Sequence, residues 1–150
     1  MTTAIILGYI GAAFMVGFSG VASALGTAIC GMTSVGAMKK DASKFGSYMI
    51  LSALPGSQGL YGFVCYFMIQ SFLTADITML QGAGIFAGGV AMALAALVSA
   101  YYQAKVCAAG IAAIGNGHDV MTRTLILAVF PELYAILGLA TVFLISLAIV

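Results

Sequence analysis

The chain consists of four long apolar runs separated by three short polar interruptions. The interruptions lie at residues 39–44, 74–76 and 115–119. Because a membrane-spanning helix needs about 20 apolar residues, the pattern predicts four such helices. Their approximate limits are residues 3–37, 45–73, 82–114 and 122–150. Helices of about 30 residues exceed a hydrocarbon core ~30 Å thick, so we expect them to protrude or tilt.

Composition agrees with a membrane protein built from helices. Of the 150 residues, 63% are hydrophobic and 6% are charged, whereas soluble domains carry about 25% charged residues. The net charge of +1 argues against a nucleic-acid partner, which requires clustered Lys and Arg. Cys30, Cys65 and Cys107 are isolated within apolar runs, so neither a disulfide nor a zinc site is expected. We expect a single all-α membrane domain over residues 1–150.

Basic residues predict the orientation of this domain. Three lysines lie in the first polar interruption and Arg123 borders the third, whereas the second holds only Asp76 as a charged residue. Loops rich in Lys and Arg face the cytoplasm. The loops at about 38–46 and 114–122 are therefore expected to be cytoplasmic, and both termini are expected to be extracytoplasmic.

The two halves of the chain repeat a short pattern. Residues 51–56 read Leu-Ser-Ala-Leu-Pro-Gly, and residues 127–132 read Leu-Ala-Val-Phe-Pro-Glu. In the same register Gly62 falls opposite Gly138. An internal repeat at a constant offset predicts that one structural unit is present twice.

The repeated unit is a helical hairpin. The first copy covers about residues 1–74 and the second about 80–150. Gly56 of the first copy stands where the second has Glu132. Only one of the two hairpins therefore carries a carboxylate at this position.

The first and third helices carry stripes of small residues, whereas the second and fourth carry aromatic residues. Small residues at three- and four-residue spacing let helix backbones approach closely in a membrane. A slim helix followed by a thick one, twice, makes a wedge, and wedges placed side by side close into a ring with the slim helices inside. A compact four-helix bundle explains the same stripes. The stripes are Ala13, Gly17, Gly20, Ala24, Ala28 and Gly31 in the first helix, and Gly84, Gly88, Ala91, Ala95 and Ser99 in the third.

Glu132 places an ionisable group inside the last apolar run. A charged side chain at the centre of a membrane helix costs about 2.5–3.5 kcal/mol on insertion scales, and such residues mark functional sites. Counted from the cytoplasmic helix ends at ~1.5 Å per residue, Ser57, Gln58 and Gln103 reach a depth similar to that of Glu132. Tyr61 lies one turn beyond Gln58 on the same predicted helix.

These side chains form an oxygen-rich set with one negative charge. Hard cations take oxygen ligands, and one carboxylate balances one monovalent ion. Pro55 and Pro131 remove backbone donors and can loosen their helices, which frees carbonyls such as that of Leu54 to act as ligands. A polar cluster that only holds helices together is the alternative. The presence of Glu132 at the same depth favours an ion site.

Three segments resemble the K subunits of bacterial V-type ATPases, the duplicated proteolipids of the membrane rotor ring. They are residues 54–63, which read Leu-Pro-Gly-Ser-Gln-Gly-Leu-Tyr-Gly-Phe, residues 103–106 and residues 132–138. The resemblance covers nearly the whole chain. It implies a homo-oligomeric ring in lipid, a stator subunit with an essential arginine, and a central-stalk subunit at the cytoplasmic loops. The chain has no P-loop, so we expect other subunits to hydrolyse ATP.

Within that family, the sodium-carrying members are the more similar to this chain. The resemblance implies that Tyr61 steadies the carboxylate of the site. Relatives that carry sodium often have Thr at the position of Ser57, and serine keeps the hydroxyl. H⁺ is the alternative ion, and no organic cofactor is expected. The implied Na⁺ ligands are Glu132, Gln103, Gln58, Ser57 and the carbonyl of Leu54.

Two other functions fit parts of the pattern. A proton-coupled secondary transporter or exporter, in which Glu132 binds protons and substrate in turn, predicts an aromatic-lined cavity and a dimer. A structural pore ring without coupling leaves Glu132 unexplained. The duplicated hairpin with an acid in one copy favours the rotor subunit.

Overall fold

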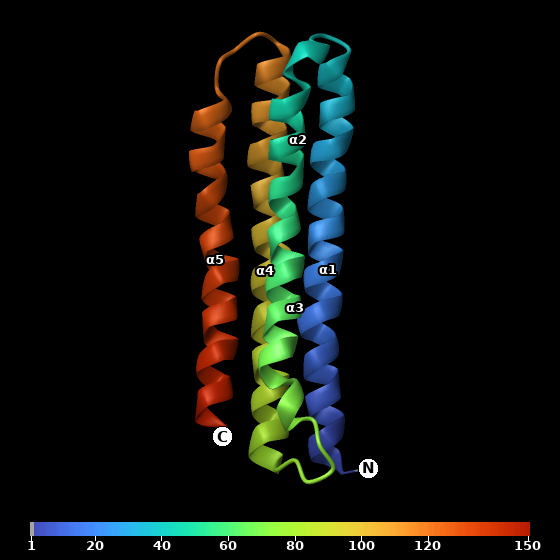
Figure 1. Ribbon diagram of the computed structural model, residues 1–150, viewed down its shortest axis with the longest axis vertical. Coiled ribbons are helices and arrows are strands. Elements are labelled where there is room, and N and C mark those ends of the chain that lie inside the picture. Colours follow the sequence, from blue (N-terminus) through green and yellow to red (C-terminus); the bar gives the residue numbers. More distant parts are fainter. Residues whose placement is uncertain (1) are drawn as a thin grey trace.

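Helices make up the whole secondary structure of residues 2–150, the part of the chain that the computed structural model describes. The long helices run side by side, and α2, η2 and α3 continue one another as one rod (Figure 1). The bounds are α1 Thr3–Met38, η1 Ala42–Lys44, α2 Phe45–Ala53, η2 Leu54–Gly56, α3 Ser57–Ile69, η3 Gln70–Phe72, α4 Met79–Gly115 and α5 Met121–Ala148, where η marks a 3-10 helix.

The predicted spans are present, but the second one is interrupted. α1, α4 and α5 are each long and apolar enough to cross a membrane, and their ends lie within a few residues of the predicted limits. The second span is divided by η2, which contains Pro55. Proline has no N–H group and its ring disturbs the preceding helical turn, so the α-helix gives way there to a tighter turn.

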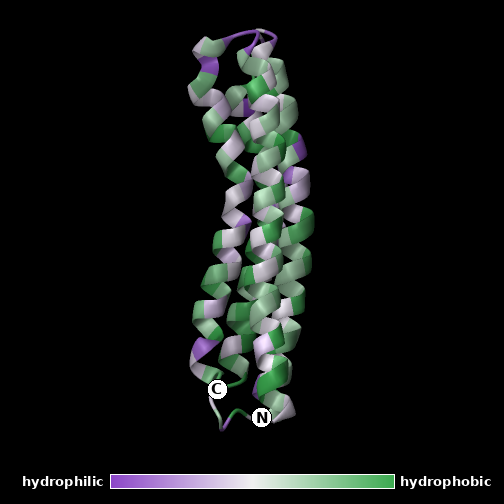
Figure 2. Cartoon of the chain, turned by 90° about the vertical axis from the view of Figure 1, so that its right-hand side faces the viewer, coloured by the Kyte–Doolittle hydropathy of each residue, from purple (hydrophilic) through white to green (hydrophobic). Residues whose placement is uncertain are grey.

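The surface of the helices is apolar, as a lipid environment requires. The hydrophilic colour is strongest in the loops at the end opposite both termini, while the helices are mostly apolar (Figure 2). Both termini lie at the same end of the molecule (Figure 1). The chain is a multi-pass membrane protein.

Glycines bring α1 and α4 into backbone contact. A side chain at Gly89 would overlap the backbone of Gly11, and a side chain at Gly11 would overlap the backbone of Ile85. Gly82 meets the backbone of Ala4 in the same way. Glycine at these positions permits the close approach on which membrane helix packing depends.

The predicted small-residue stripe of the first helix does not make this contact. A Cβ built at Gly17, Gly20 or Gly31 meets no atom within 4 Å, so this side of α1 is open within the chain. In α4, Gly84 and Gly88 both approach the side chain of Ile145 of α5, and Gly88 also approaches that of Met15 of α1. These three glycines of α1 therefore have no partner inside the described part of one copy of the protein.

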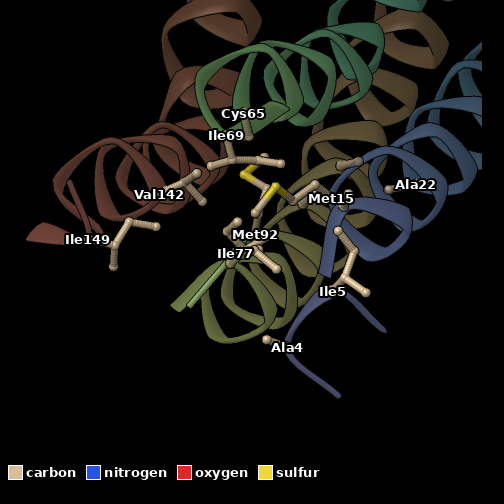
Figure 3. Packing of buried hydrophobic residues seen from close by; sticks show 14 residues of the cluster. Ala4, Ile5, Met15, Ala22, Cys65, Ile69, Ile77, Met92, Val142 and Ile149 are labelled. Atoms are coloured by element: carbon tan, nitrogen blue, oxygen red, sulfur yellow. The ribbon is translucent and has the colours of Figure 1, made fainter. Parts of the chain in front are cut away.

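Two apolar clusters form the core, one on each side of a polar layer. The first includes Met15, Cys65 and Met92 near the end that holds the termini (Figure 3). The second includes Tyr48 and Ile111 toward the opposite end. Along the helices, the polar side chains of the candidate site lie between these two clusters.

Asp41 organises the loop between α1 and α2. Its carboxylate accepts hydrogen bonds from the backbone N–H and the hydroxyl of Ser43, at 2.9 and 2.6 Å. The hydroxyl bond, followed by the backbone bond, lowers the pKa of Asp41 below the ordinary value of 3.8. Because the folded-state pKa is depressed, the cap is fully effective above the unfolded-state pKa and is lost as pH falls through the folded-state pKa.

Replacement of Asp41 by alanine should therefore speed amide hydrogen exchange of residues 42–45 at pH 7. The difference from the unmodified chain should disappear below the folded-state pKa of Asp41, when both proteins are compared at the same pH. Asp119→Ala, in the other loop at this end, is the control and should leave exchange of these amides unchanged. Equal exchange of both proteins at pH 7 would contradict the capping role.

Candidate ion-binding site

The break at Pro55 positions the first group of the site. Pro55 is buried, and a Cβ built on Gly26 of α1 would lie 2.5 Å from its Cβ. Glycine at position 26 therefore lets the proline turn press against α1. α3 begins directly after this turn and carries Ser57, Gln58 and Tyr61 on its first two turns.

Glu132 of α5 is held by two neighbouring helices. Tyr61 of α3 donates its hydroxyl hydrogen to Oε1 of Glu132 at 2.7 Å. Gln103 of α4 donates from Nε2 to Oε2 of Glu132 at 2.9 Å, and also to the carbonyl of Ala128 at 3.1 Å. Hydrogen bonds to a charged acceptor are about twice as strong as neutral ones, so the carboxylate is stabilised where lipid would disfavour it.

Gln58 extends this network and leaves one acceptor free. Its Nε2 donates to Oε1 of Gln103 at 2.8 Å and to Oγ of Ser99 at 3.0 Å. Gln58 has no exposed surface, and its Oε1 has no hydrogen-bond partner within residues 2–150. A buried polar atom without a partner costs about 1–3 kcal/mol. The site therefore contains an oxygen that lacks a hydrogen-bond donor or a cation.

Ser57 and Leu54 pair with each other beside this network. The Ser57 hydroxyl donates to the Leu54 carbonyl at 3.1 Å, and the backbone N–H of Ser57 is bonded to the same carbonyl. The carbonyl of Leu54 is thus engaged, although the sequence predicts that it is freed by Pro55. A 3-10 turn forms i to i+3 hydrogen bonds, and the bond from the Ser57 N–H to the Leu54 carbonyl is one of them.

The second proline behaves differently. α5 continues as an α-helix through Pro131, so the expected loosening does not interrupt this helix. Only one backbone donor is lost, since proline lacks its N–H group, and the helix persists on both sides. Pro131 instead lines a groove of about 420 Å³ between α4 and α5.

Ser99 is a member of the network that sequence reasoning did not identify. It is 3% exposed and accepts the hydrogen bond from Gln58. Ser99 lies four residues before Gln103, and side chains at this spacing share one face of a helix. That spacing is the signal that connects Ser99 to the site.

The network offers one carboxylate together with several neutral oxygens. No group of three or more His, Cys, Asp or Glu side chains suited to a metal ion occurs in residues 2–150. Lys105 is exposed, and its Nζ lies 4.5 Å from the centre of the Tyr101 ring. The carboxylate and its neutral oxygens fit a single monovalent cation with oxygen ligands.

Comparisons with known proteins agree with the duplicated fold. The ATP synthase C-subunit family matches the chain twice, at residues 10–69 and 86–145, an offset of 76 residues. The V-type sodium ATPase subunit K of Enterococcus hirae is 38% identical over 130 residues, which is 87% of this chain and 83% of that protein.

A second relative comes from another type of rotary complex. The A-type ATP synthase subunit K of Methanocaldococcus jannaschii is 35% identical over 139 residues, which is 93% of this chain and 61% of that protein. The sequence match covers both hairpins of this chain. The chain therefore belongs to the ATP synthase C-subunit family and is an ion-carrying subunit of the membrane rotor ring of a rotary ATPase, not one of its catalytic subunits.

Proposed function

We propose that each copy of the chain binds one Na⁺ at Glu132 and carries it through the membrane as the ring rotates. The observation that carries this proposal is the buried Oε1 of Gln58, which has no partner in the described residues and belongs to the network around Glu132. A cation supplies what this oxygen lacks. The proposed ligand set comprises Glu132, Gln103, Gln58, Ser57 and the carbonyl of Leu54, whose hydrogen bond from the Ser57 hydroxyl would give way to the ion.

Sodium explains more of the site than a proton does. A proton needs only the carboxylate, whereas two fully buried amides and a serine hydroxyl suit an ion with several oxygen ligands. A single carboxylate balances Na⁺, while divalent ions usually recruit more acidic ligands. The relative from Enterococcus hirae is named as a subunit of a sodium ATPase, which agrees with this ion.

Ion binding acts as an electrostatic switch. With Na⁺ bound, the charge of Glu132 is balanced and the site passes lipid at little cost. Without the ion, the carboxylate carries the cost of about 2.5–3.5 kcal/mol for a charge in the membrane. It is then stable only beside a water-filled path or a cation, a role that fits an arginine of the stator subunit. Moving one charge against 100 mV costs about 2.3 kcal/mol, so uphill transport requires ATP hydrolysis by other subunits.

The loops opposite the termini are proposed to face the cytoplasm and to contact the central stalk. The first of them holds Lys39 and Lys40, and Nζ of Lys40 bonds Oδ1 of Asn116 at 2.7 Å, which joins the two loops. Basic loops favour the cytoplasmic side. Residues 1–150 then form one membrane domain with both termini outside.

Sodium should protect Glu132 from dicyclohexylcarbodiimide, a reagent that modifies protonated carboxyl groups in membranes. We expect added NaCl to slow modification of Glu132 in purified protein at constant pH, because Na⁺ occupies the oxygens that the proton needs. Equal KCl should give no such protection. Modification is measured by mass spectrometry of the peptide that contains Glu132.

The exposed Asp76 of the same chain is the internal control, since its modification should not depend on Na⁺. Equal protection by KCl, or no protection by either salt, would contradict sodium binding and leave H⁺ as the transported ion.

A further inference from the structure

Three residues of α5 are exposed although their counterparts in the first hairpin are buried. The offset of 76 residues pairs Leu51, Gln58 and Cys65 with Leu127, Tyr134 and Thr141. The first three have no exposed surface. Leu127 and Tyr134 are 55% and 67% exposed, and Thr141 is exposed as well. We call the latter three residues the α5 stripe.

The same comparison identifies an open face on α1. The face of α4 that packs against the first hairpin is buried. The equivalent residues of α1, which lie 76 positions earlier in the sequence, are exposed. The buried residues include Ile85, Gly89, Ala96, Ala100 and Ala104. Their exposed counterparts, which we call the α1 stripe, are Tyr9, Ala13, Gly20, Ala24 and Ala28.

The repeat explains why burial differs between equivalent positions. The second hairpin covers the first, but within residues 2–150 nothing covers the outer side of the second hairpin or the outer side of α1. α1 and α5 lie at opposite sides of the molecule (Figure 1). If the contact between the two hairpins of one chain is repeated between neighbouring copies, the α5 stripe of one copy and the α1 stripe of the next are both buried.

We propose that the next copy of this chain docks its α1 stripe beside the α5 stripe, so that Tyr134 fills the position at the boundary that Gln58 fills inside the chain. The inference rests on ring assembly and adds the faces and the register of the contact. Gln58 reaches Ser99 and Gln103. The residues of α1 that correspond to Ser99 and Gln103 are Ser23 and Thr27. We therefore expect Tyr134 of one copy to face Ser23 and Thr27 of the next copy.

This boundary repeats the shape of the ion site without its charge. Glu132 corresponds to Gly56, and Tyr61 corresponds to Leu137. The bulky, mostly apolar ring of Tyr134 stands in place of a buried amide. The boundary between copies is thus closed by Tyr134 and does not form a second cation site.

The sizes of the facing residues are complementary. Tyr102 of α4 stands where α1 has Gly26, the glycine that lets Pro55 approach. Tyr102, Tyr134 and Pro131 line the open groove of about 420 Å³ between α4 and α5. The α1 stripe opposite them presents Gly20 and the alanines, and a Cβ built at Gly20 meets no atom within 4 Å. Large side chains of one copy therefore meet small ones of the next.

Cross-linking of the assembled complex tests this register. A chain with Thr27→Cys and Tyr134→Cys, treated in membranes with a short thiol-to-thiol cross-linker, should give a ladder of covalent oligomers. Each substitution alone should give none, because the contact is heterologous and joins different residues of the two copies. The unmodified chain is the blank, since Cys30, Cys65 and Cys107 have no exposed surface.

The matched control combines Tyr134→Cys with Leu25→Cys. Leu25 is 59% exposed and lies two residues from Thr27, but its counterpart Tyr101 stays 44% exposed against the first hairpin. The Thr27 pair should therefore cross-link at least about tenfold more than the Leu25 pair. Intact rings in which the Leu25 pair reacts equally, or in which neither pair reacts, would overturn the proposed register while ring assembly stands.

A second pair decides the matter if the first variant does not assemble. The backbone contact of Gly11 with Gly89 corresponds to Ala87 of one copy and Ala13 of the next. Oxidation of Ala13→Cys with Ala87→Cys should give the same ladder by direct disulfide formation. Intact rings without this cross-link would overturn the inference. Unmodified particles that are not rings would overturn the ring assembly itself.

Discussion

Glu132→Gln should abolish Na⁺-dependent ATP hydrolysis by the assembled complex, with a decrease of roughly 100-fold or more. Glutamine has nearly the same shape, but it carries no charge to balance a cation. The carboxylate also accepts charge-assisted hydrogen bonds from Tyr61 and Gln103, each worth about 1.5–3 kcal/mol, and every 1.4 kcal/mol is a factor of about ten in affinity. ATPase activity against Na⁺ concentration measures the effect.

Asp76→Asn is the matched control for this variant. It makes the same change from acid to amide in an exposed loop at the end of the molecule that holds the termini. We expect it to retain Na⁺-dependent activity, and we expect both variants to form rings. Na⁺-dependent hydrolysis that survives Glu132→Gln would remove Glu132 from the transport mechanism.

Hydropathy predicts the helices well because lipid imposes a simple rule on the chain. Each span must satisfy its own backbone hydrogen bonds, so long apolar runs become helices. The two prolines show where this rule is insufficient. Pro55 interrupts its helix and is buried against Gly26, whereas Pro131 leaves α5 continuous beside Tyr102. The difference depends on the neighbouring helix, which the sequence around each proline does not reveal.

Small residues show a similar limit. The spacing of the stripe in the first helix correctly indicates a side of α1 without bulky side chains. It does not indicate what covers that side. Gly11 and Gly89 make the contact between α1 and α4, while Gly17 and Gly20 remain open. A contact between two helices requires matched positions on both, and the spacing within one helix gives only half of that information.

The depth of polar residues brings together the centre of the candidate site but not its complete hydrogen-bond network. Counting along the helices brings Gln58, Gln103 and Tyr61 to the level of Glu132, and the structure joins these four side chains. The spacing of small residues assigns Ser99 to helix packing, but a serine can serve both in packing and in hydrogen bonding, and here it accepts a hydrogen bond from Gln58. Which role applies depends on the rotation of α4, and that rotation is set by its contact with α1.

The family assignment favours the rotor subunit over a secondary transporter. It also offers an explanation for the presence of an acid, Glu132, in only one of the two hairpins. Both hairpins keep the proline and the later glycine of the repeated pattern, yet only the second keeps the acid. In the chain, Gln58 of one hairpin reaches Gln103 of the other. The proposed ion site therefore needs both hairpins, and each copy would offer one carboxylate to the rotor.

Gln103→Leu should raise the Na⁺ concentration that half-protects Glu132 from carbodiimide by about 10- to 100-fold. Gln103 bonds the carboxylate of Glu132, the carbonyl of Ala128 and the amide of Gln58, so leucine removes a proposed ligand and the group that aligns Glu132 and Gln58. One charge-assisted hydrogen bond is worth about 1.5–3 kcal/mol, which corresponds to this change in affinity. The ring should persist, because leucine preserves apolar packing at this depth.

Ser99→Ala distinguishes alignment from ligation in the same assay. Ser99 accepts one neutral hydrogen bond from Gln58, so its loss should raise the half-protecting concentration by about 2- to 10-fold, less than the loss of Gln103. The control is Gln70→Leu, which removes an exposed amide just after the C-terminal end of α3. It should leave Na⁺ protection unchanged. Equal protection of the Gln103 variant and the unmodified chain would exclude Gln103 as a ligand. An effect of Ser99→Ala as large as that of Gln103→Leu would instead make the position of Gln58 the main determinant of sodium affinity.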